Sequence, residues 1–141
     1  MAEIITHVSR DEWNSFMRFL EKSYGHSFGY FTEHYPEIYH HDDKSLESFY
    51  VIKKGGKIVS HAGLYPLDVI SDNVHIPVGG IGGVATLPEE RGKGYMGKLL
   101  SHVITRMQEK GLPLSFLSGD RYRYGNFGWE NAGEKMVLQF N

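Results

Sequence analysis

Apolar residues recur at helical spacing in two stretches of the chain. In residues 13–24 they follow the pattern i, i+3, i+4, i+7, i+11, one face of an α-helix: Trp13, Phe16, Met17, Leu20 and Tyr24. In residues 95–110 a similar stripe consists of Met96, Leu99, Leu100, Val103, Ile104 and Met107. We predict a helix over each stretch. A capping box at 9–12 begins the first helix and Gly25 ends it, and Gly111 ends the second.

Strand-forming residues, many alternating with polar ones, fill the middle of the chain. Gly55 and Gly56 predict a hairpin turn, and Asp72 and Asn73 predict a second turn. Pro77 cannot donate a hydrogen bond to a neighbouring strand, so it marks a sheet edge or a bulge. We expect strands at 3–8, 48–53, 57–64, 67–71, 74–78, 79–86, 114–117 and 134–140.

Two segments follow no simple pattern. Residues 79–83 read Gly-Gly-Ile-Gly-Gly, so either another group approaches this backbone closely or the segment is a flexible turn. Residues 26–44 are rich in aromatic and histidine side chains and are interrupted by Gly29 and Pro36. We predict a short helix near 37–41 and interpret the whole segment as a lid or pocket wall.

Composition narrows the class of protein. With 141 residues and 40% hydrophobic content, the chain has the size of a single domain, placed at 1–141. The formal net charge of -2, without a basic stripe, argues against nucleic acid as a partner. The absence of cysteine excludes disulfides and thiolate chemistry. No apolar run approaches the ~20 residues that span a bilayer, so we expect a cytoplasmic protein with no membrane partner.

The stretch 84–100 has the strongest chemical signature. It reads as a strand, a turn at Pro88, a loop at 91–97 with three glycines and two cations, and then the second helix. Backbone N–H groups at such a helix start, together with the helix dipole, bind anions, above all phosphate. The loop matches neither a Walker sequence nor a G-x-G-x-x-G sequence. A purely structural connection between strand and helix is the alternative interpretation.

The order of elements and two motifs resemble the GCN5-related N-acetyltransferase (GNAT) superfamily over nearly the whole chain. The motifs are Gly-Gly-Val-Ala-Thr-Leu-Pro-Glu-Glu-Arg-Gly-Lys-Gly-Tyr-Met at 82–96 and Tyr-Gly-Asn-Phe-Gly-Trp at 124–129. Both look most similar to the N-terminal domain of acetyltransferases of the enhanced intracellular survival type. Met96 departs from the usual loop, which has glycine or alanine there, and Gly97 follows one place later. Members of that branch carry further domains, so the chain is either a stand-alone relative or part of a longer protein.

The resemblance implies an α/β (α+β) GNAT fold, with a mixed, mostly antiparallel sheet that splays at the cofactor site and is flanked by helices. It implies acetyl-CoA as co-substrate, in the opening between the strand ending at Thr86 and the strand ending at Leu117. Backbone groups of Val84, Ala85 and Thr86 would pair with the pantetheine arm, and glycines 82–83 would leave room for the thioester. The residues implied to hold the pyrophosphate are Arg91, Gly92, Lys93, Gly94, Tyr95, Met96 and Gly97.

The resemblance also makes Tyr124 the candidate general acid. A phenol with an ordinary pKa near 10 is protonated at neutral pH and can donate to a thiolate leaving group. Without the resemblance, packing beside Phe127 and Trp129 is the favoured interpretation of Tyr124. Tyr122 is a reserve. Asp120 is a tentative second catalytic residue, although an acidic residue after a strand is more often a helix cap.

No general base is evident, because glycines 79–83 occupy the region where many relatives place a glutamate. A water chain, Asp120, His61 or a histidine of the aromatic segment stay open as alternatives. The run His-His-Asp-Asp at 40–43 raises the question of a metal. Adjacent side chains rarely point at one ion, so we expect no metal site.

The leading hypothesis is an acetyl-CoA-dependent N-acetyltransferase that acts on a primary amine of a small molecule or peptide. Acidic positions around the aromatic segment suit a cationic acceptor. The alternatives are a non-catalytic acyl-CoA-binding module and a purely structural domain, because a fold alone does not determine function. We expect a monomer or homodimer.

Overall fold

A computed structural model describes residues 4–133 of the chain. Their centre is one sheet of five strands in the order β1-β2-β3-β4-β5, in which only the β4–β5 pair is parallel. The strands are β1 Ile5–His7, β2 Phe49–Lys54, β3 Lys57–Ser71, β4 Val74–Thr86 and β5 Leu114–Leu117. The helices are α1 Trp13–Tyr24, α2 Tyr30–His34, α3 Asp43–Leu46, α4 Tyr95–Glu109 and α5 Arg121–Tyr124. This mixed, mostly antiparallel sheet flanked by helices confirms the predicted fold class.

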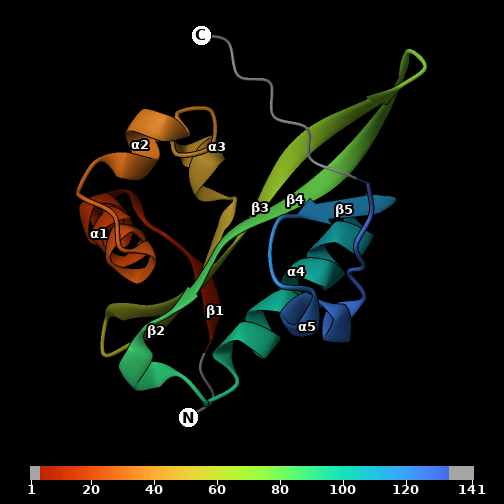
Figure 1. The fold of residues 1–141 in the computed structure, drawn as a ribbon. Helices are drawn as coiled ribbons and strands as arrows, with labels where there is room; N and C mark the ends of the chain where they lie inside the picture. Colours follow the sequence, from red (N-terminus) through yellow and green to blue (C-terminus); the bar gives the residue numbers. More distant parts are fainter. Residues whose placement is uncertain (1–3, 134–141) are drawn as a thin grey trace, which may run out of the picture.

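Helix α1 covers one side of the sheet together with α2 and α3 (Figure 1). Its start is fixed by the Glu12 carboxylate, which accepts hydrogen bonds from the N–H and hydroxyl of Ser9 at 2.9 and 2.8 Å and pairs with Lys53 of β2 at 2.7 Å. Gly25 ends the helix with a φ of +72°. Phe16 is fully buried, with its ring centroid 4.9 Å from that of Phe49. The predicted helix, its capping box and its stop are therefore confirmed.

Helix α4 lies on the other side of the sheet with α5 (Figure 1). The members of its apolar stripe that are fully buried are Leu99, Leu100 and Val103. The helix ends as predicted, because Gly111 follows Lys110 with a φ of +67°. Strand β5 then runs parallel to β4 as the crossover helix requires.

Strands β3 and β4 are longer than the sequence pattern predicts. Each of them joins two predicted strands into one, and together they form a hairpin arm (Figure 1). The predicted turn at its tip is confirmed, because Asp72 and Asn73 have φ of 47° and 64°. Pro77 directly precedes Val78, the first β4 residue that pairs with β5. It therefore lies where β4 has only one neighbour, which confirms the predicted sheet edge.

The glycine run lies inside β4, and other groups do approach it closely. A Cβ on Gly79 would lie 2.5 Å from the Met107 sulfur of α4, and one on Gly82 would lie 2.9 Å from the Tyr65 ring. Between the pairs His61–Ala85 and Gly63–Gly82 the β3–β4 register shifts, and Gly83 there has a φ of +62°. This irregularity is a bulge in β4, because that strand supplies one residue more. The interpretation of the run as a flexible turn is wrong.

The aromatic segment 26–44 differs from its prediction. Its helices are α2 and α3, and the helix predicted near 37–41 is wrong. There the chain makes a single turn, closed by the Tyr39 N–H donating to the Tyr35 carbonyl at 3.0 Å. It does not propagate because Asp42 adopts an extended backbone and caps α3, accepting from the Ser45 N–H at 2.8 Å. The strand predicted at 134–140 lies outside the described residues.

Candidate functional site

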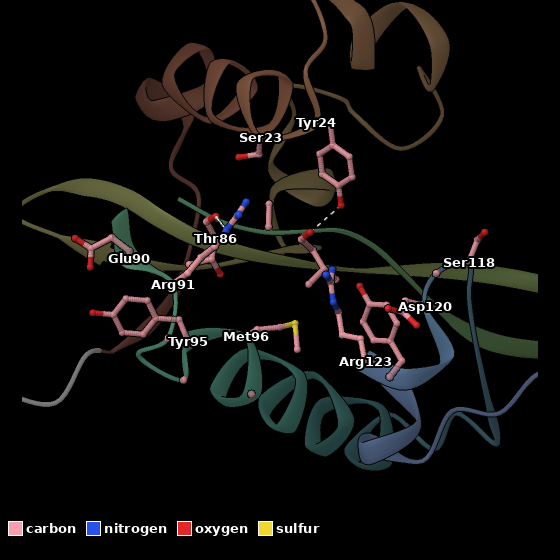
Figure 2. Close-up of a pocket in the computed structure, with 17 residues that line it drawn as sticks. Ser23, Tyr24, Thr86, Glu90, Arg91, Tyr95, Met96, Ser118, Asp120 and Arg123 are labelled. Atoms are coloured by element: carbon pink, nitrogen blue, oxygen red, sulfur yellow. Dashed lines mark hydrogen bonds between the residues drawn. The ribbon is translucent and has the colours of Figure 1, made fainter. Parts of the chain in front are cut away.

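A cleft opens where β4 and β5 separate. Within the described residues the two strands pair from Val78–Leu114 to Ile81–Leu117, and β4 then continues to Thr86 with β3 as its neighbour on one side and no strand on the other. The cleft has a volume of about 660 Å³. It is lined by Ser23, Tyr24, Val84, Ala85, Thr86, Glu90, Arg91, Gly92, Gly94, Tyr95, Met96, Gly97, Ser118, Gly119, Asp120, Arg123 and Tyr124. The predicted splay of the sheet is thus confirmed, and side chains from α1, α4 and α5 gather around it (Figure 2).

The cleft brings together most of the residues that sequence reasoning selected. Both candidate catalytic residues, Tyr124 and Asp120, line it, as do nine of the ten candidate cofactor residues. The exception is Lys93, whose Nζ lies 2.6 Å from the Glu90 carboxylate. Hydrogen bonding to that carboxylate raises the pKa of Lys93, so its ammonium stays charged but is already paired. Arg91 is consequently the cation of this loop that faces the cleft.

The free edge of β4 presents backbone groups in an alternating pattern. The Val84 carbonyl accepts from the Tyr24 hydroxyl at 2.7 Å, and the Thr86 carbonyl accepts from Nε of Arg91 at 3.3 Å (Figure 2). The Ala85 carbonyl instead accepts from the Ser60 hydroxyl of β3 at 3.1 Å. Val84 and Thr86 therefore offer their carbonyls to the cleft, whereas Ala85 offers its carbonyl to the sheet interior.

The loop before α4 has the backbone shape of an anion site. Gly92 and Gly94 have φ of +77° and +80°, and a Cβ at either position would meet open space. Gly94 is the N-cap of α4, so the first turn of this helix points its N–H groups into the loop. Positive dipole, glycine backbone and the Arg91 guanidinium converge here, which favours a phosphate group.

The other end of the cleft holds two tyrosines. Tyr24 comes from the last turn of α1, and burial, with smaller contributions from Tyr124 and Tyr39, raises its pKa to about 12 although Arg123 lowers it. Tyr124 is buried, with its ring centroid 6.3 Å from that of Trp129. Tyr124 thus packs beside Trp129, as the packing interpretation expects, and it also lines the cleft, while its role as general acid stays a prediction. Tyr122, the reserve candidate, is 89% exposed and does not line the cleft.

Asp120 caps α5. Its carboxylate accepts from the Tyr122 N–H at 2.9 Å, which is the helix-cap interpretation that its position after β5 favoured. The same residue lines the cleft.

His61 lies in the core and does not line the cleft. The Gly83 carbonyl can only accept, so Nδ1 of His61, 2.7 Å away, carries the proton and donates it. Nε2 has no hydrogen-bond partner among residues 4–133. Burial lowers the pKa of His61 to about 4, so the ring is neutral at physiological pH. It holds the bulge of β4 rather than facing a ligand.

The aromatic segment 26–44, predicted to be a lid or pocket wall, does not form a wall of this cleft. No residue of 26–44 is among those that line the cleft, and Phe31 and Tyr39 are buried in the core instead. The His-His-Asp-Asp run is used structurally: His41 donates from Nε2 to the Arg10 carbonyl at 2.7 Å, and Asp43 pairs with Arg10 at 2.6 Å. Residues 4–133 contain no group of three or more potential metal ligands.

Sequence reasoning missed six lining residues: Ser23, Tyr24, Glu90, Ser118, Gly119 and Arg123. Tyr24 had a signal, because it closes the apolar stripe of its helix with a side chain that carries a hydroxyl. Arg123 had another, since it is a cation directly before the candidate acid Tyr124.

None of the helices within residues 4–133 has the length and apolar character needed to cross a membrane.

Comparisons with known proteins agree with this geometry. A family model described as an acetyltransferase (GNAT) domain matches residues 5–132. No protein of curated function matches the chain significantly by sequence.

Solved structures share the fold. A predicted acetyltransferase from Clostridium acetobutylicum, solved with acetyl-CoA, is similar with a TM-score of 0.77 at 15% identity over 98% of this chain and 96% of that one. A GCN5-related N-acetyltransferase from Anabaena variabilis has a TM-score of 0.77 at 26% identity over 94% of this chain and 33% of that one. A probable N-acyltransferase from Enterococcus faecalis has a TM-score of 0.74 at 18% identity over 91% of this chain and 32% of that one.

The chain thus spans about a third of the Anabaena and Enterococcus proteins but nearly all of the Clostridium protein. The narrower likeness to the enhanced intracellular survival type stays a prediction. The family model covers almost the whole chain, and the fold and the splayed sheet agree with it, so the chain belongs to the acetyltransferase (GNAT) domain family.

Proposed function

We propose that this chain transfers the acetyl group of acetyl-CoA to a primary amine of a small molecule or peptide. The observation that carries the proposal is a single cleft with a phosphate-type loop at one end and Tyr124 at the other. Acetyl-CoA needs a phosphate site and a reaction site at opposite ends of one extended cleft, because its phosphates and its reacting sulfur are far apart. The free edge of β4 lies between them.

Each part of the cleft suits a different part of acetyl-CoA. Gly92 and Gly94 leave space beside the N–H groups of the first turn of α4, and Arg91 adds a positive charge for the pyrophosphate. The Val84 and Thr86 carbonyls face the cleft, where amides of a pantetheine arm can donate to them as a neighbouring strand would. A carbonyl oxygen has two lone pairs, so Val84 can accept from a ligand as well as from Tyr24.

Tyr124 would act at the acetyl end. In the proposed reaction the amine displaces the thiol, so a C–N bond forms and the C–S bond breaks. Tyr124 gives its hydroxyl proton to the departing sulfur, and the proton released by the amine restores the phenol through water. Such general acid catalysis is worth about 10²–10⁴-fold in rate.

Both carboxylates of the lining already have partners. Glu90 is paired with Lys54 and Lys93, and Asp120 accepts the Tyr122 N–H of its helix cap through Oδ1. We therefore infer that the amine arrives neutral or loses its proton to water, which implies a rate that rises with pH until the amine is fully deprotonated. The same observation favours the rival function, a non-catalytic acyl-CoA-binding module.

One assay separates the two functions. The protein is incubated with acetyl-CoA and a panel of primary amines, and free thiol is measured over time. Amine-dependent release supports transfer, whereas binding of acetyl-CoA without release on any amine supports the binding module. A protein that does neither is the structural domain of the third alternative.

A further inference from the structure

Arg123 is a cation whose side chain is committed to no partner within residues 4–133. It lines the cleft, yet no hydrogen bond or ion pair to its guanidinium occurs in the described part of the chain. Arg121, two residues earlier on the same short helix, behaves differently: its Nε lies 3.1 Å from the Glu130 carboxylate, and it does not line the cleft. The two arginines can thus be compared directly, because Arg121 is paired outside the cleft and Arg123 is available inside it.

The Arg123 guanidinium lies at the end of the cleft that holds Tyr24 and Tyr124, where the proposed reaction places the acetyl group. Figure 2 shows Arg123 extending from α5 toward the part of the cleft into which Tyr24 also points. Arg123 lies close enough to Tyr24 to lower the pKa of that phenol, and Tyr124 is its neighbour in sequence. The phosphate-type loop has its own cation in Arg91, which is anchored on the Thr86 carbonyl at 3.3 Å. Arg123 is therefore not needed to complete that loop.

An available guanidinium in a cleft selects for negative charge. Its planar fork donates two parallel hydrogen bonds to a carboxylate or a phosphate. It repels ammonium groups that are not themselves the reacting amine, so polycations are disfavoured. The acidic positions that suggested a cationic acceptor belong to segment 26–44, which does not line the cleft. Asp120 is the acidic neighbour of Arg123 in the lining, and its carboxylate is held by the α5 cap.

We propose that the acceptor of this enzyme is a primary amine that also carries a carboxylate or phosphate group, and that Arg123 binds this anionic group. The proposal rests on the proposed acetyl transfer and names the class of acceptor for that site. Arg123 is then a specificity-determining residue, whereas Tyr124 acts on the reacting atoms.

The test compares amines that share a short chain and differ in charge. Ethylamine, β-alanine, O-phosphoethanolamine and cadaverine are assayed for thiol release with saturating acetyl-CoA. We expect at least one of the two anionic amines to exceed ethylamine and cadaverine in kcat/KM by about tenfold or more, the size of a charge-assisted contact. Preference between β-alanine and O-phosphoethanolamine distinguishes a carboxylate from a phosphate.

Two variants sharpen the test. In Arg123→Gln the anionic preference should disappear through a higher KM for the anionic amine, while the acetyl-CoA dissociation constant changes less than about twofold. Arg121→Gln, the matched control, should keep the preference. Calorimetric titration of O-phosphoethanolamine and β-alanine into the CoA-saturated protein gives a readout independent of turnover, and we expect binding that Arg123→Gln abolishes.

The proposal would be overturned if ethylamine reacted as fast as the two anionic amines, or if cadaverine were preferred. It would also be overturned if neither anionic amine bound the CoA-saturated protein. A third contrary result would be an Arg123→Gln variant that binds acetyl-CoA about tenfold more weakly and keeps the amine preference, because Arg123 would then bind the cofactor. Failure of acetyl-CoA itself to bind would instead refute the proposed function.

Discussion

At the scale of single residues, His61 shows how the core supports the cleft. Its Nδ1 donates to the Gly83 carbonyl at 2.7 Å, and Gly83 directly precedes Val84 at the cleft edge. The residue is fully buried, and its Nε2 lacks a partner within the described residues. A charged ring in this place would be costly, which is why burial lowers its pKa.

This pKa predicts how stability depends on pH. The folded-state pKa of about 4 lies below the ordinary value of 6.5, so between these limits the unfolded chain binds a proton that the folded chain does not. The free energy of unfolding therefore falls as pH drops from 6.5 to 4, by about 3 kcal/mol for this group. Replacing His61 by Gln should make the pH dependence shallower by that amount, measured by urea unfolding at pH 7, 6, 5 and 4.5. Parallel curves for variant and wild type would show that His61 is not the responsible group.

The role proposed for Tyr124 gives a second prediction at this scale. Tyr124→Phe keeps the ring that packs near Trp129 but removes the proton donor, so kcat should fall about 10²-fold or more. The acetyl-CoA dissociation constant should change little. Tyr122→Phe is the matched control, because that side chain is 89% exposed outside the cleft, and its kcat should stay within about twofold. Unchanged turnover in Tyr124→Phe would remove this residue from the mechanism.

The sequence predicted those site residues that belong to a continuous motif or lie next to a predicted strand. The place of Tyr124 and most of the loop in the cleft was predictable because these residues belong to the two motifs, and that of Asp120 because it follows the predicted strand 114–117. The contribution of Tyr24 was not, since it depends on the end of α1 reaching the Val84 carbonyl 60 residues away in sequence. The pairing of Lys93 with Glu90 was equally hidden, because it depends on the turn that places the two side chains together.

At the scale of elements, both ends of α4 depend on glycines with left-handed backbone. Gly94 begins the helix at the cleft with φ +80°, and Gly111 follows its end with φ +67°. Neither would push a Cβ into other atoms. A side chain at either position would thus cause a similar backbone strain. Of the two glycines, only Gly94 lines the cleft.

This symmetry defines a prediction with an internal control. Gly94→Ala and Gly111→Ala should each lower the free energy of unfolding by about 1 kcal/mol, because a side chain disfavours this backbone region. Only Gly94→Ala should weaken acetyl-CoA binding, by about tenfold, because it changes the shape of the phosphate loop. Chemical denaturation and calorimetry measure the two effects. Equal loss of binding in both variants would mean that helix stability, not the loop, controls the affinity.

Elements with strong local patterns were predicted well. The two long helices, β2 and β5 followed from periodicity and turn residues. The continuity of β3 and β4 did not, because Pro66 and the glycine run interrupt the strand pattern locally. The pairing of Pro66 with Gly79 and the close approach of Met107 to Gly79 depend on residues distant in sequence. Helices α2 and α3 were missed because each is only about one turn long, which is too short to show an apolar stripe.

At the scale of the whole molecule, the cleft results from one topological feature. Strand β4 pairs with β5 over four residues, and its bulge then carries it away from β5 toward Thr86. Side chains from α1, α4 and α5 meet in the opening (Figure 2). The family resemblance predicted this opening, but composition and periodicity alone could not, because a register shift depends on pairing between distant segments.

Calorimetric titration of acetyl-CoA into the protein measures directly whether this opening binds the cofactor, as proposed. We expect one site per chain with a dissociation constant below about 1 mM, the upper range for enzyme substrates. We also expect Arg91→Gln to weaken this binding and Arg121→Gln to leave it unchanged. No heat of binding at millimolar acetyl-CoA would show that the opening is not a cofactor site.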